Sequence, residues 1–146
     1  MEKNYISNDI NEILKNNICY VNKNLYVKES SLFNIGFGVF TNSKIKKYDI
    51  IEIAPVILLE RSFIMNNPSE INNYTFKNNN DTSKSIFALG YGGVYNHSDN
   101  PNVFYKYLGD RKMIYIALTD INKDEELFVS YGKNWWTIKN RNKINN

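Results

Sequence analysis

Short apolar runs separated by turn residues fill the chain from residue 25 onward, and this spacing most constrains the fold. The runs are rich in β-branched and aromatic side chains and are too short for typical helices, so they favour strands. The expected strands are Leu25–Val27, Gly36–Phe40, Ile50–Leu59, Asn102–Tyr107, Met113–Leu118 and Leu127–Ser130. Turn residues such as Gly109-Asp110 separate them. The pattern predicts a mainly β domain of the α+β class, made of many short strands.

Two short helices are expected beside the strands. Residues 7–17 read as an amphipathic helix with Ser7 as its N-cap. The segment Asn67-Pro68-Ser69-Glu70 offers an N-cap, a proline at the first helical position and an acidic residue at the third, which predicts a helix from Pro68 to Phe76. The polar segment Asn78–Lys84 is expected to form an exposed loop.

The length of 146 residues corresponds to one domain. Its single cysteine excludes an internal disulfide and any Cys-rich zinc site, and it favours a reducing, intracellular setting. No apolar stretch is long enough to span a membrane, and the polar N-terminus does not resemble a secretory signal. The net charge of +3 is too small to indicate a nucleic-acid partner.

Three segments stand apart from the strand pattern as candidates for a functional site. Gly36-Phe37-Gly38 is typical of a bend between strands, or of a close backbone approach to a ligand. Gly90–Asn102 contains the only histidine, His97, which alone cannot form a metal site. Glu126–Gly132 reads as an edge strand and its turn, and Trp135-Trp136 after it as cover for the core.

In their order and spacing, these segments resemble the SET methyltransferase family. The most specific element is Asn96-His97-Ser98-x-x-Pro101-Asn102, which lies between the Gly-x-Gly element and the Glu-Leu-x-x-x-Tyr element that ends at Tyr131. The resemblance covers residues 25 to about 139, and it is nearest to the minimal SET proteins of large DNA viruses. Those proteins share Ala-Leu-Gly-aromatic-Gly before Asn-His-Ser, and Ser-Tyr-Gly before an aromatic pair.

The resemblance implies a fold and a division of the chain. A SET-domain β-clip fold has several short-stranded sheets, short helices and a C-terminal pseudoknot, which would bring Asn96-His97 beside Tyr131. Residues 25–133 would then be the catalytic core, residues 1–24 an N-terminal extension with a short helix, and residues 134–146 a segment that closes the lysine channel.

The resemblance also implies a chemistry: methyl transfer from S-adenosyl-L-methionine to a protein lysine, with S-adenosyl-L-homocysteine as the product. Tyr131 would be the catalytic residue. The residues expected at the cofactor are Gly36, Phe37, Gly38, Asn96, His97, Tyr131 and Trp136. The residues expected along the substrate channel are Tyr74, Tyr95 and Trp135.

Two departures from the family pattern matter. Asp99 stands where the common motif has a cysteine that often joins a zinc site, so a zinc-free enzyme without a metal site is expected. Val129 stands where many members carry a second tyrosine, so the number of methyl groups added stays open.

The expected partner is a protein substrate that presents a lysine in an extended peptide bound by strand addition. A histone tail is the first candidate, histone H3 before the others, which points to the nucleus or chromatin and leaves the cytoplasm open. By the same resemblance a homodimer is expected to complete the peptide site. Neither membrane association nor direct nucleic-acid binding is expected. The alternatives are a SET methyltransferase of a non-histone protein, a non-catalytic SET-like binding module and a small β domain that binds nucleic acid.

Overall fold

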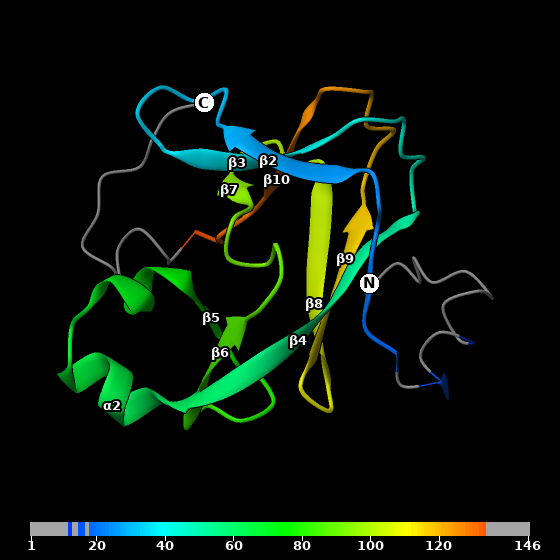
Figure 1. Ribbon diagram of the computed structural model, residues 1–146. Helices are drawn as coiled ribbons and strands as arrows, with labels where there is room; N and C mark the ends of the chain where they lie inside the picture. The colour runs from blue at the N-terminus through cyan, green and yellow to red at the C-terminus, as the bar shows by residue number, and fades with distance from the viewer. Residues whose placement is uncertain (1–11, 13–14, 17, 134–146) are drawn as a thin grey trace.

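The computed structural model describes residues 12, 15–16 and 18–133, and strands dominate this part of the chain (Figure 1). The elements in chain order are β1 (Tyr20–Val21), β2 (Leu25–Glu29), β3 (Phe37–Thr41), β4 (Ile50–Glu60), α2 (Arg61–Asn66), the 3-10 helix η1 (Glu70–Tyr74), β5 (Thr75–Lys77), β6 (Lys84–Ala88), β7 (Asn96–His97), β8 (Val103–Gly109), β9 (Lys112–Ala117) and β10 (Glu126–Val129). The prediction of a mainly β domain is confirmed.

The long strand β4 organises the larger of two sheets, whose order is β5-β6-β4-β9-β8. Along one edge β4 changes partner: β1 pairs with it as far as Ile53, and β6 pairs with it from Val56 onward. Pro55 lies in the gap between these two partners. Because proline has no N–H to donate, this gap is where a proline is tolerated within a central strand.

The smaller sheet has the order β2-β3-β10-β7 and joins segments that are distant in sequence. β10 pairs antiparallel with β3, where Leu127 lies opposite Val39. On its other side β10 runs parallel to β7, so that Phe128 lies opposite Asn96 and Val129 opposite His97. This pairing confirms the expectation, drawn from the resemblance, that the Asn-His segment lies next to the segment that leads to Tyr131.

One hydrophobic core connects the two sheets. Side chains from both of them are fully buried in it, including Val39, Ile51, Tyr115 and Leu127. A backbone bridge between Ile45 and Ile121 joins the segment between β3 and β4 to the segment between β9 and β10. Both isoleucine side chains are buried in the same core. The polar segments of the site are therefore held on a rigid support.

The six expected strands are confirmed, with ends that shift by at most two residues. The expected helix from Pro68 to Phe76 is wrong: the 3-10 helix Glu70–Tyr74 and strand β5 occupy that segment. Ser69 is the N-cap of η1, whereas Asn67 ends α2. No residue of η1 is buried, so the segment has no apolar face that would support a longer α-helix.

The expected exposed loop Asn78–Lys84 is only partly correct. Asn78 is buried, and its side-chain oxygen accepts the backbone N–H groups of Asn80 and Asp81. Lys84 already begins β6. Turn formation around a buried asparagine explains why a run of polar residues need not lie fully in solvent.

The expected N-terminal helix over residues 7–17 falls largely outside the described residues, as does the expected channel-closing segment 134–146. Within the described part, no helix is both long and apolar enough to cross a membrane. That part also contains no group of three or more His, Cys, Asp or Glu side chains placed to hold a metal ion.

Candidate active site

Tyr131 lies just beyond β10 and is fixed through both its backbone and its side chain. Its N–H donates to Nδ1 of His97 at 3.0 Å, and its hydroxyl donates to the backbone carbonyl of Tyr95 at 2.9 Å. The rings of His97 and Tyr131 lie 5.3 Å apart. The position of the Tyr131 hydroxyl is therefore set by two residues more than thirty positions earlier in the chain.

His97 is buried and has a defined tautomer. Because Nδ1 accepts the N–H of Tyr131, the ring proton lies on Nε2, which faces Oδ1 of Asp99 at 3.2 Å. Asp99 therefore orients the imidazole at the position where the family motif commonly has a cysteine. In this structure the lone histidine serves as a hydrogen-bond acceptor that holds the segment after β10.

Asn96 and Glu126 form a polar pair on the other side of β7. The side-chain amide of Asn96 donates to the carbonyl of Phe37 at 2.9 Å and to Oε1 of Glu126 at 3.0 Å. A Cβ atom on Gly38 would lie 2.1 Å from that same carboxylate oxygen. The second glycine of the Gly-x-Gly element is thus required by the close packing of Glu126 and Asn96.

Glu126 also holds the loop that precedes β3. Its carboxylate accepts hydrogen bonds from the Ser30 hydroxyl at 2.8 Å and from the Ser31 N–H at 2.8 Å, and the Ser31 hydroxyl adds another at 2.5 Å. Gly36, at the end of this loop, has a φ of +93° and accepts the Ser30 N–H with its carbonyl. The three candidate segments of the sequence therefore meet around one buried carboxylate.

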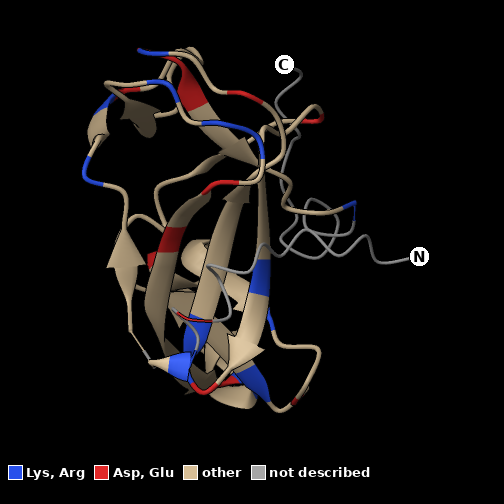
Figure 2. Ribbon diagram, turned by 90° about the vertical axis from the view of Figure 1, so that its right-hand side faces the viewer, with Lys and Arg blue, Asp and Glu red and all other residues tan. Residues whose placement is uncertain are grey.

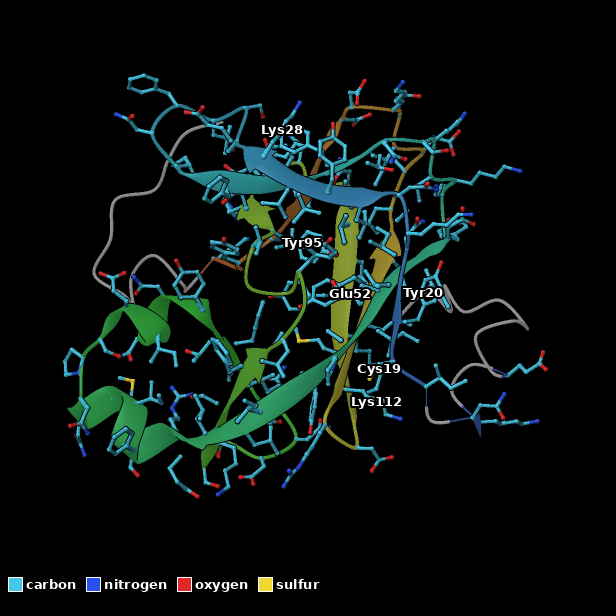
Figure 3. All side chains as sticks on the ribbon, viewed as in Figure 1. Cys19, Tyr20, Lys28, Glu52, Tyr95 and Lys112 are labelled. Carbon is cyan, nitrogen blue, oxygen red and sulfur yellow. The ribbon has the colours of Figure 1, made fainter. Side chains whose placement is uncertain are left out.

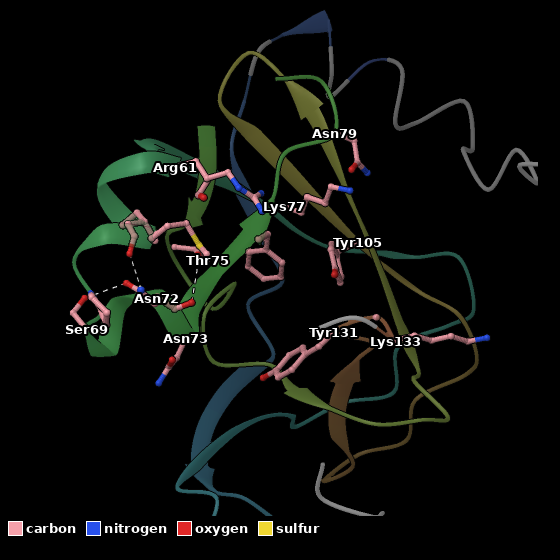
Figure 4. Close-up of a pocket in the computed structure, with 16 residues that line it drawn as sticks. Arg61, Ser69, Asn72, Asn73, Thr75, Lys77, Asn79, Tyr105, Tyr131 and Lys133 are labelled. Carbon is pink, nitrogen blue, oxygen red and sulfur yellow. Dashed lines mark hydrogen bonds between the residues drawn. The ribbon is translucent and has the colours of Figure 1, made fainter. Parts of the chain in front are cut away.

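Two cavities meet at Tyr131. The larger has a volume of about 650 Å³ and lies beside α2 and η1 (Figure 4). The smaller is a narrow space of about 30 Å³. Residues lining both cavities are Asn73, Thr75, Phe76, Tyr105 and Tyr131. The smaller one is also lined by Tyr74 and Tyr95, so a wide opening leads to a narrow aromatic space next to the Tyr131 hydroxyl.

Next to Tyr95, which lines this narrow space, Glu52 holds the segment that leads to β7 (Figure 3). Its carboxylate accepts the N–H of Tyr91 at 3.0 Å and the hydroxyl of Tyr95 at 2.8 Å. Burial raises the pKa of Glu52 above its ordinary value, and these two hydrogen bonds oppose the shift. Burial first, and the Glu52 charge second, also raise the pKa of Tyr95 well above the usual range for tyrosine.

Most of the residues expected from the sequence come together, but not all of them are described. Gly36, Phe37, Gly38, Asn96, His97 and Tyr131 lie around β3, β7 and β10, and Tyr74 and Tyr95 line the narrow cavity. Trp135 and Trp136 lie outside the described residues.

Sequence reasoning did not single out Glu52, Tyr105 and Phe76. Tyr105 and Phe76 lie on strands β8 and β5, and no sequence motif marks them. Glu52 could have been suspected only from a charged residue within the apolar run that forms β4.

The polar atoms near Asn96 suit a ligand that carries positive charge. The carbonyl of Phe37, the amide oxygen of Asn96 and the carboxylate of Glu126 are all hydrogen-bond acceptors, and they lie together where the Asn96 and Glu126 side chains are buried and Phe37 is exposed. S-adenosylmethionine carries an ammonium group and a sulfonium group beside its carboxylate, so this acceptor set fits the cationic groups of the expected cofactor.

Comparisons with known proteins give matches over most of the chain. A model of the SET domain matches residues 36–132. The chain is 34% identical over 104 residues to "Histone-lysine N-methyltransferase, H3 lysine-37 specific" of Schizosaccharomyces pombe, an alignment covering 69% of each protein. It is also similar to a Plasmodium falciparum crystal structure of a protein proposed to be a histone methyltransferase. That match has a TM-score of 0.63 and 36% sequence identity, and it covers 80% of this chain and 99% of the other.

Proposed function

The chain belongs to the SET-domain family, and from this premise we propose that its site methylates a histone lysine with S-adenosylmethionine as the methyl donor. Protein-lysine N-methyltransferase activity follows from the family. The observation that carries the site assignment is that Tyr131, which lines the narrow aromatic cavity, is held by His97, the neighbour of Asn96 on β7.

S-adenosylmethionine supplies an activated methyl group when it is bound. The acceptor cluster of Phe37, Asn96 and Glu126 would hold the charged end of this cofactor. The Tyr131 hydroxyl donates its proton to Tyr95 O, so toward a substrate its oxygen acts as a hydrogen-bond acceptor. An acceptor at this point orients the lysine amine, and much of the rate would then come from positioning.

The attacking lysine amine must be neutral. A free lysine with its ordinary pKa is less than about a thousandth neutral at pH 7. The narrow cavity lined by Tyr74, Tyr95 and Tyr105 would lower the lysine pKa by excluding water, and the cofactor's positive charge would lower it further. Turnover should therefore rise from pH 7 toward pH 9, as long as the chemical step is rate-limiting.

The substrate assignment draws on the two matched proteins, whose names refer to histones. Histone H3 is the first candidate because the yeast protein is described as specific for lysine 37 of that histone. A histone substrate would place the enzyme at chromatin in a nucleus. The homodimer, the absence of zinc and the likeness to viral SET proteins stay predictions.

The test is incubation with radiolabelled S-adenosylmethionine and each core histone, with Tyr131→Phe in parallel. The variant removes the hydroxyl but keeps the backbone N–H that donates to His97, so cofactor affinity measured by titration calorimetry should change little. Turnover should fall by at least about 100-fold, the scale of losing one hydrogen-bonding group that acts in the transition state.

Three outcomes would count against parts of this assignment. Equal losses in turnover and in cofactor affinity would reject the role given to the Tyr131 hydroxyl. Cofactor binding without label on any histone would point to a non-histone substrate. Absence of cofactor binding would favour a non-catalytic SET-like module.

A further inference from the structure

Glu52 is a buried carboxylate that takes part in none of the ion pairs among the described residues. Charged residues lie mostly in loops and near strand ends (Figure 2), whereas Glu52 lies within β4, next to a bulge in its pairing with β9. Burying a carboxylate without a cation costs free energy unless hydrogen-bond donors satisfy it. The role of Glu52 must therefore come from the donors around it.

Both oxygens of this carboxylate hold the segment between β6 and β7. Oε1 accepts the N–H of Tyr91 at 3.0 Å, and Oε2 accepts the hydroxyl of Tyr95 at 2.8 Å. The same segment leaves room for the carboxylate at Gly90, where a Cβ atom would lie 2.2 Å from Oε1. Gly90 also has a φ of +66°, which favours glycine. The segment is therefore shaped around this one carboxylate.

Tyr95 connects Glu52 to the proposed active site. Its backbone carbonyl accepts the hydroxyl of Tyr131 at 2.9 Å, and its side chain lines the narrow cavity. Glu52 itself does not line that cavity. Two hydrogen bonds, one at the Tyr95 side chain and one at its backbone, thus lead from β4 to the Tyr131 hydroxyl.

Tyr115 shows that the contact with Tyr95 is selective. The two tyrosines are equally buried, and their ring centroids lie 4.8 Å apart. The hydroxyl of Tyr115, however, has no hydrogen-bond partner among the described residues. Of the two phenols that pack against each other, Glu52 holds the one whose backbone contacts Tyr131.

We propose that Glu52 is a positioning residue for methyl transfer and acts on the Tyr131 hydroxyl through Tyr95. This role rests on the proposed function, which places the substrate lysine at Tyr131. By holding the Tyr95 phenol, the carboxylate would fix one wall of the narrow cavity and the carbonyl that accepts the Tyr131 hydroxyl. A misplacement of about 1 Å at a reacting centre can slow a reaction about 100-fold.

The acceptor cluster proposed for the cofactor has its own supports. Asn96 donates to Phe37 and Glu126, and Glu126 accepts hydrogen bonds from Ser30 and Ser31. None of these hydrogen bonds involves Glu52. Loss of the Glu52 contact should therefore lower kcat while the Kd of the cofactor stays nearly constant.

The test compares Glu52→Gln, Tyr95→Phe and the double variant by turnover on core histones and by calorimetric titration of S-adenosylmethionine. A glutamine has one acceptor oxygen, so it cannot accept both the Tyr91 N–H and the Tyr95 hydroxyl. Each single change should lower kcat by about 10- to 100-fold, the scale of a displacement of up to about 1 Å. The double variant should be no slower than the slower single variant, because both changes remove the same link.

Tyr115→Phe is the matched control. It removes a phenol hydroxyl that is as deeply buried as that of Tyr95 but has no hydrogen-bond partner among the described residues, so kcat should change little. Thermal melts verify that each variant is folded. If Glu52→Gln does not fold, the comparison of Tyr95→Phe with Tyr115→Phe decides the proposal alone.

A second measurement does not depend on turnover. Fluorotyrosine incorporated at position 131 reports the surroundings of that ring by fluorine NMR. Glu52→Gln and Tyr95→Phe should shift or broaden this signal, and Tyr115→Phe should leave it nearly unchanged. This result would support the link from Glu52 to Tyr131 even if no histone accepts a methyl group, an outcome that would count against the proposed function alone.

Three results would overturn the role of Glu52. The first is a kcat and a fluorine signal that Glu52→Gln leaves unchanged. The second is an equal loss of kcat in Tyr95→Phe and Tyr115→Phe, which would indicate a general effect on the core. The third is a loss of cofactor affinity that accounts for the whole loss of turnover, which would assign Glu52 to cofactor binding.

Discussion

The carboxylate of Glu126 joins parts of the chain that lie almost a hundred residues apart. It accepts hydrogen bonds from Ser30 and Ser31 on one side and from Asn96 on the other. The same Asn96 amide reaches Phe37, so Glu126 sets the acceptor cluster proposed for the cofactor. A buried carboxylate is retained where several donors depend on it, because each donor would otherwise lose its partner.

We predict that Glu126→Gln lowers cofactor affinity and destabilises the fold by about 1 to 3 kcal/mol. A glutamine amide has one acceptor oxygen, so either Ser31 or Asn96 would lose its acceptor in a buried place. Calorimetric titration and urea unfolding measure the two effects. Glu125→Gln is the control, because its remaining oxygen can still accept the Asn122 N–H. Equal affinities in the two variants would contradict the role of Glu126.

The pKa of Glu52 gives a pH dependence with a definite sign. Burial raises this pKa above its unfolded value, so the folded state binds the proton more tightly than the unfolded state does. Stability contributed by this group is therefore highest at low pH, and it falls as pH rises from about 4 through the folded pKa. This direction is opposite to that of a carboxylate held in an ion pair.

We predict that Glu52→Gln loses this dependence. The free energy of unfolding of the wild type, relative to that of the variant, should fall as pH rises from 4 to 8. Urea unfolding of both proteins at several pH values measures this difference. If the wild type instead gains stability relative to the variant as pH rises, the hydrogen bonds from Tyr91 and Tyr95 have a larger effect on the Glu52 pKa than burial has.

The sequence predicts the motif residues of the site well, but it does not reveal the residues that hold them in place. Asn96, His97 and Tyr131 were recognisable because the family motif fixes their order and spacing. In the sequence, Glu126 is only the first residue of the Glu-Leu-x-x-x-Tyr element, and Glu52 is only a charged residue within an apolar run. Their importance comes from burial and from partners about 30 to 95 residues away, which one sequence does not display.

At the scale of elements, the β8–β9 hairpin turns through two residues with positive φ. Asp110 has a φ of 46° and Arg111 a φ of 57°. Two consecutive positive φ values are typical of a type I′ turn, which favours Asn-Gly or Asp-Gly. Arg111 thus occupies a position where the backbone of any residue other than glycine is strained.

We predict that Arg111→Gly stabilises the protein by about 0.5 to 1 kcal/mol, because it relieves the positive-φ strain of the turn. For a chain of this size the melting temperature should rise by about 1 to 4 °C. Lys123→Gly is the control: it also places glycine at an exposed turn, but Lys123 is not among the residues with positive φ. Differential scanning calorimetry compares them. A lower melting temperature for Arg111→Gly would show that the arginine side chain contributes more than the strain.

The elements that the sequence missed are β1, β5, β6, β7 and α2, and the shortest of them depend on a partner. Strands β1 and β7 have two residues each and exist because β4 and β10 pair with them. Such strands have no periodic signal of their own. Segment 67–76 has the residues that typically begin a helix, but it has no apolar face. The prediction of a helix there failed because it rested on those residues alone.

For the molecule as a whole, the proposed cofactor site is a junction between distant segments. Residues of β3, β7 and β10 contribute to it, and β10 lies between the other two in the smaller sheet. Phe37 and Asn96 are 59 positions apart, yet they share a hydrogen bond. A ligand bound there contacts segments that separate on unfolding, so its binding free energy should stabilise the entire domain.

We therefore predict that S-adenosyl-L-homocysteine raises the melting temperature of the whole chain. At about 100 times its Kd, a ligand that binds only the folded state adds about 2.7 kcal/mol of stability. For a domain of this size this corresponds to a rise of roughly 5 to 10 °C. Adenosine, which lacks the methionine portion, is the control and should give a smaller rise. Equal shifts for both ligands would argue against the acceptor cluster of Phe37, Asn96 and Glu126, because that cluster is assigned to the methionine portion that adenosine lacks.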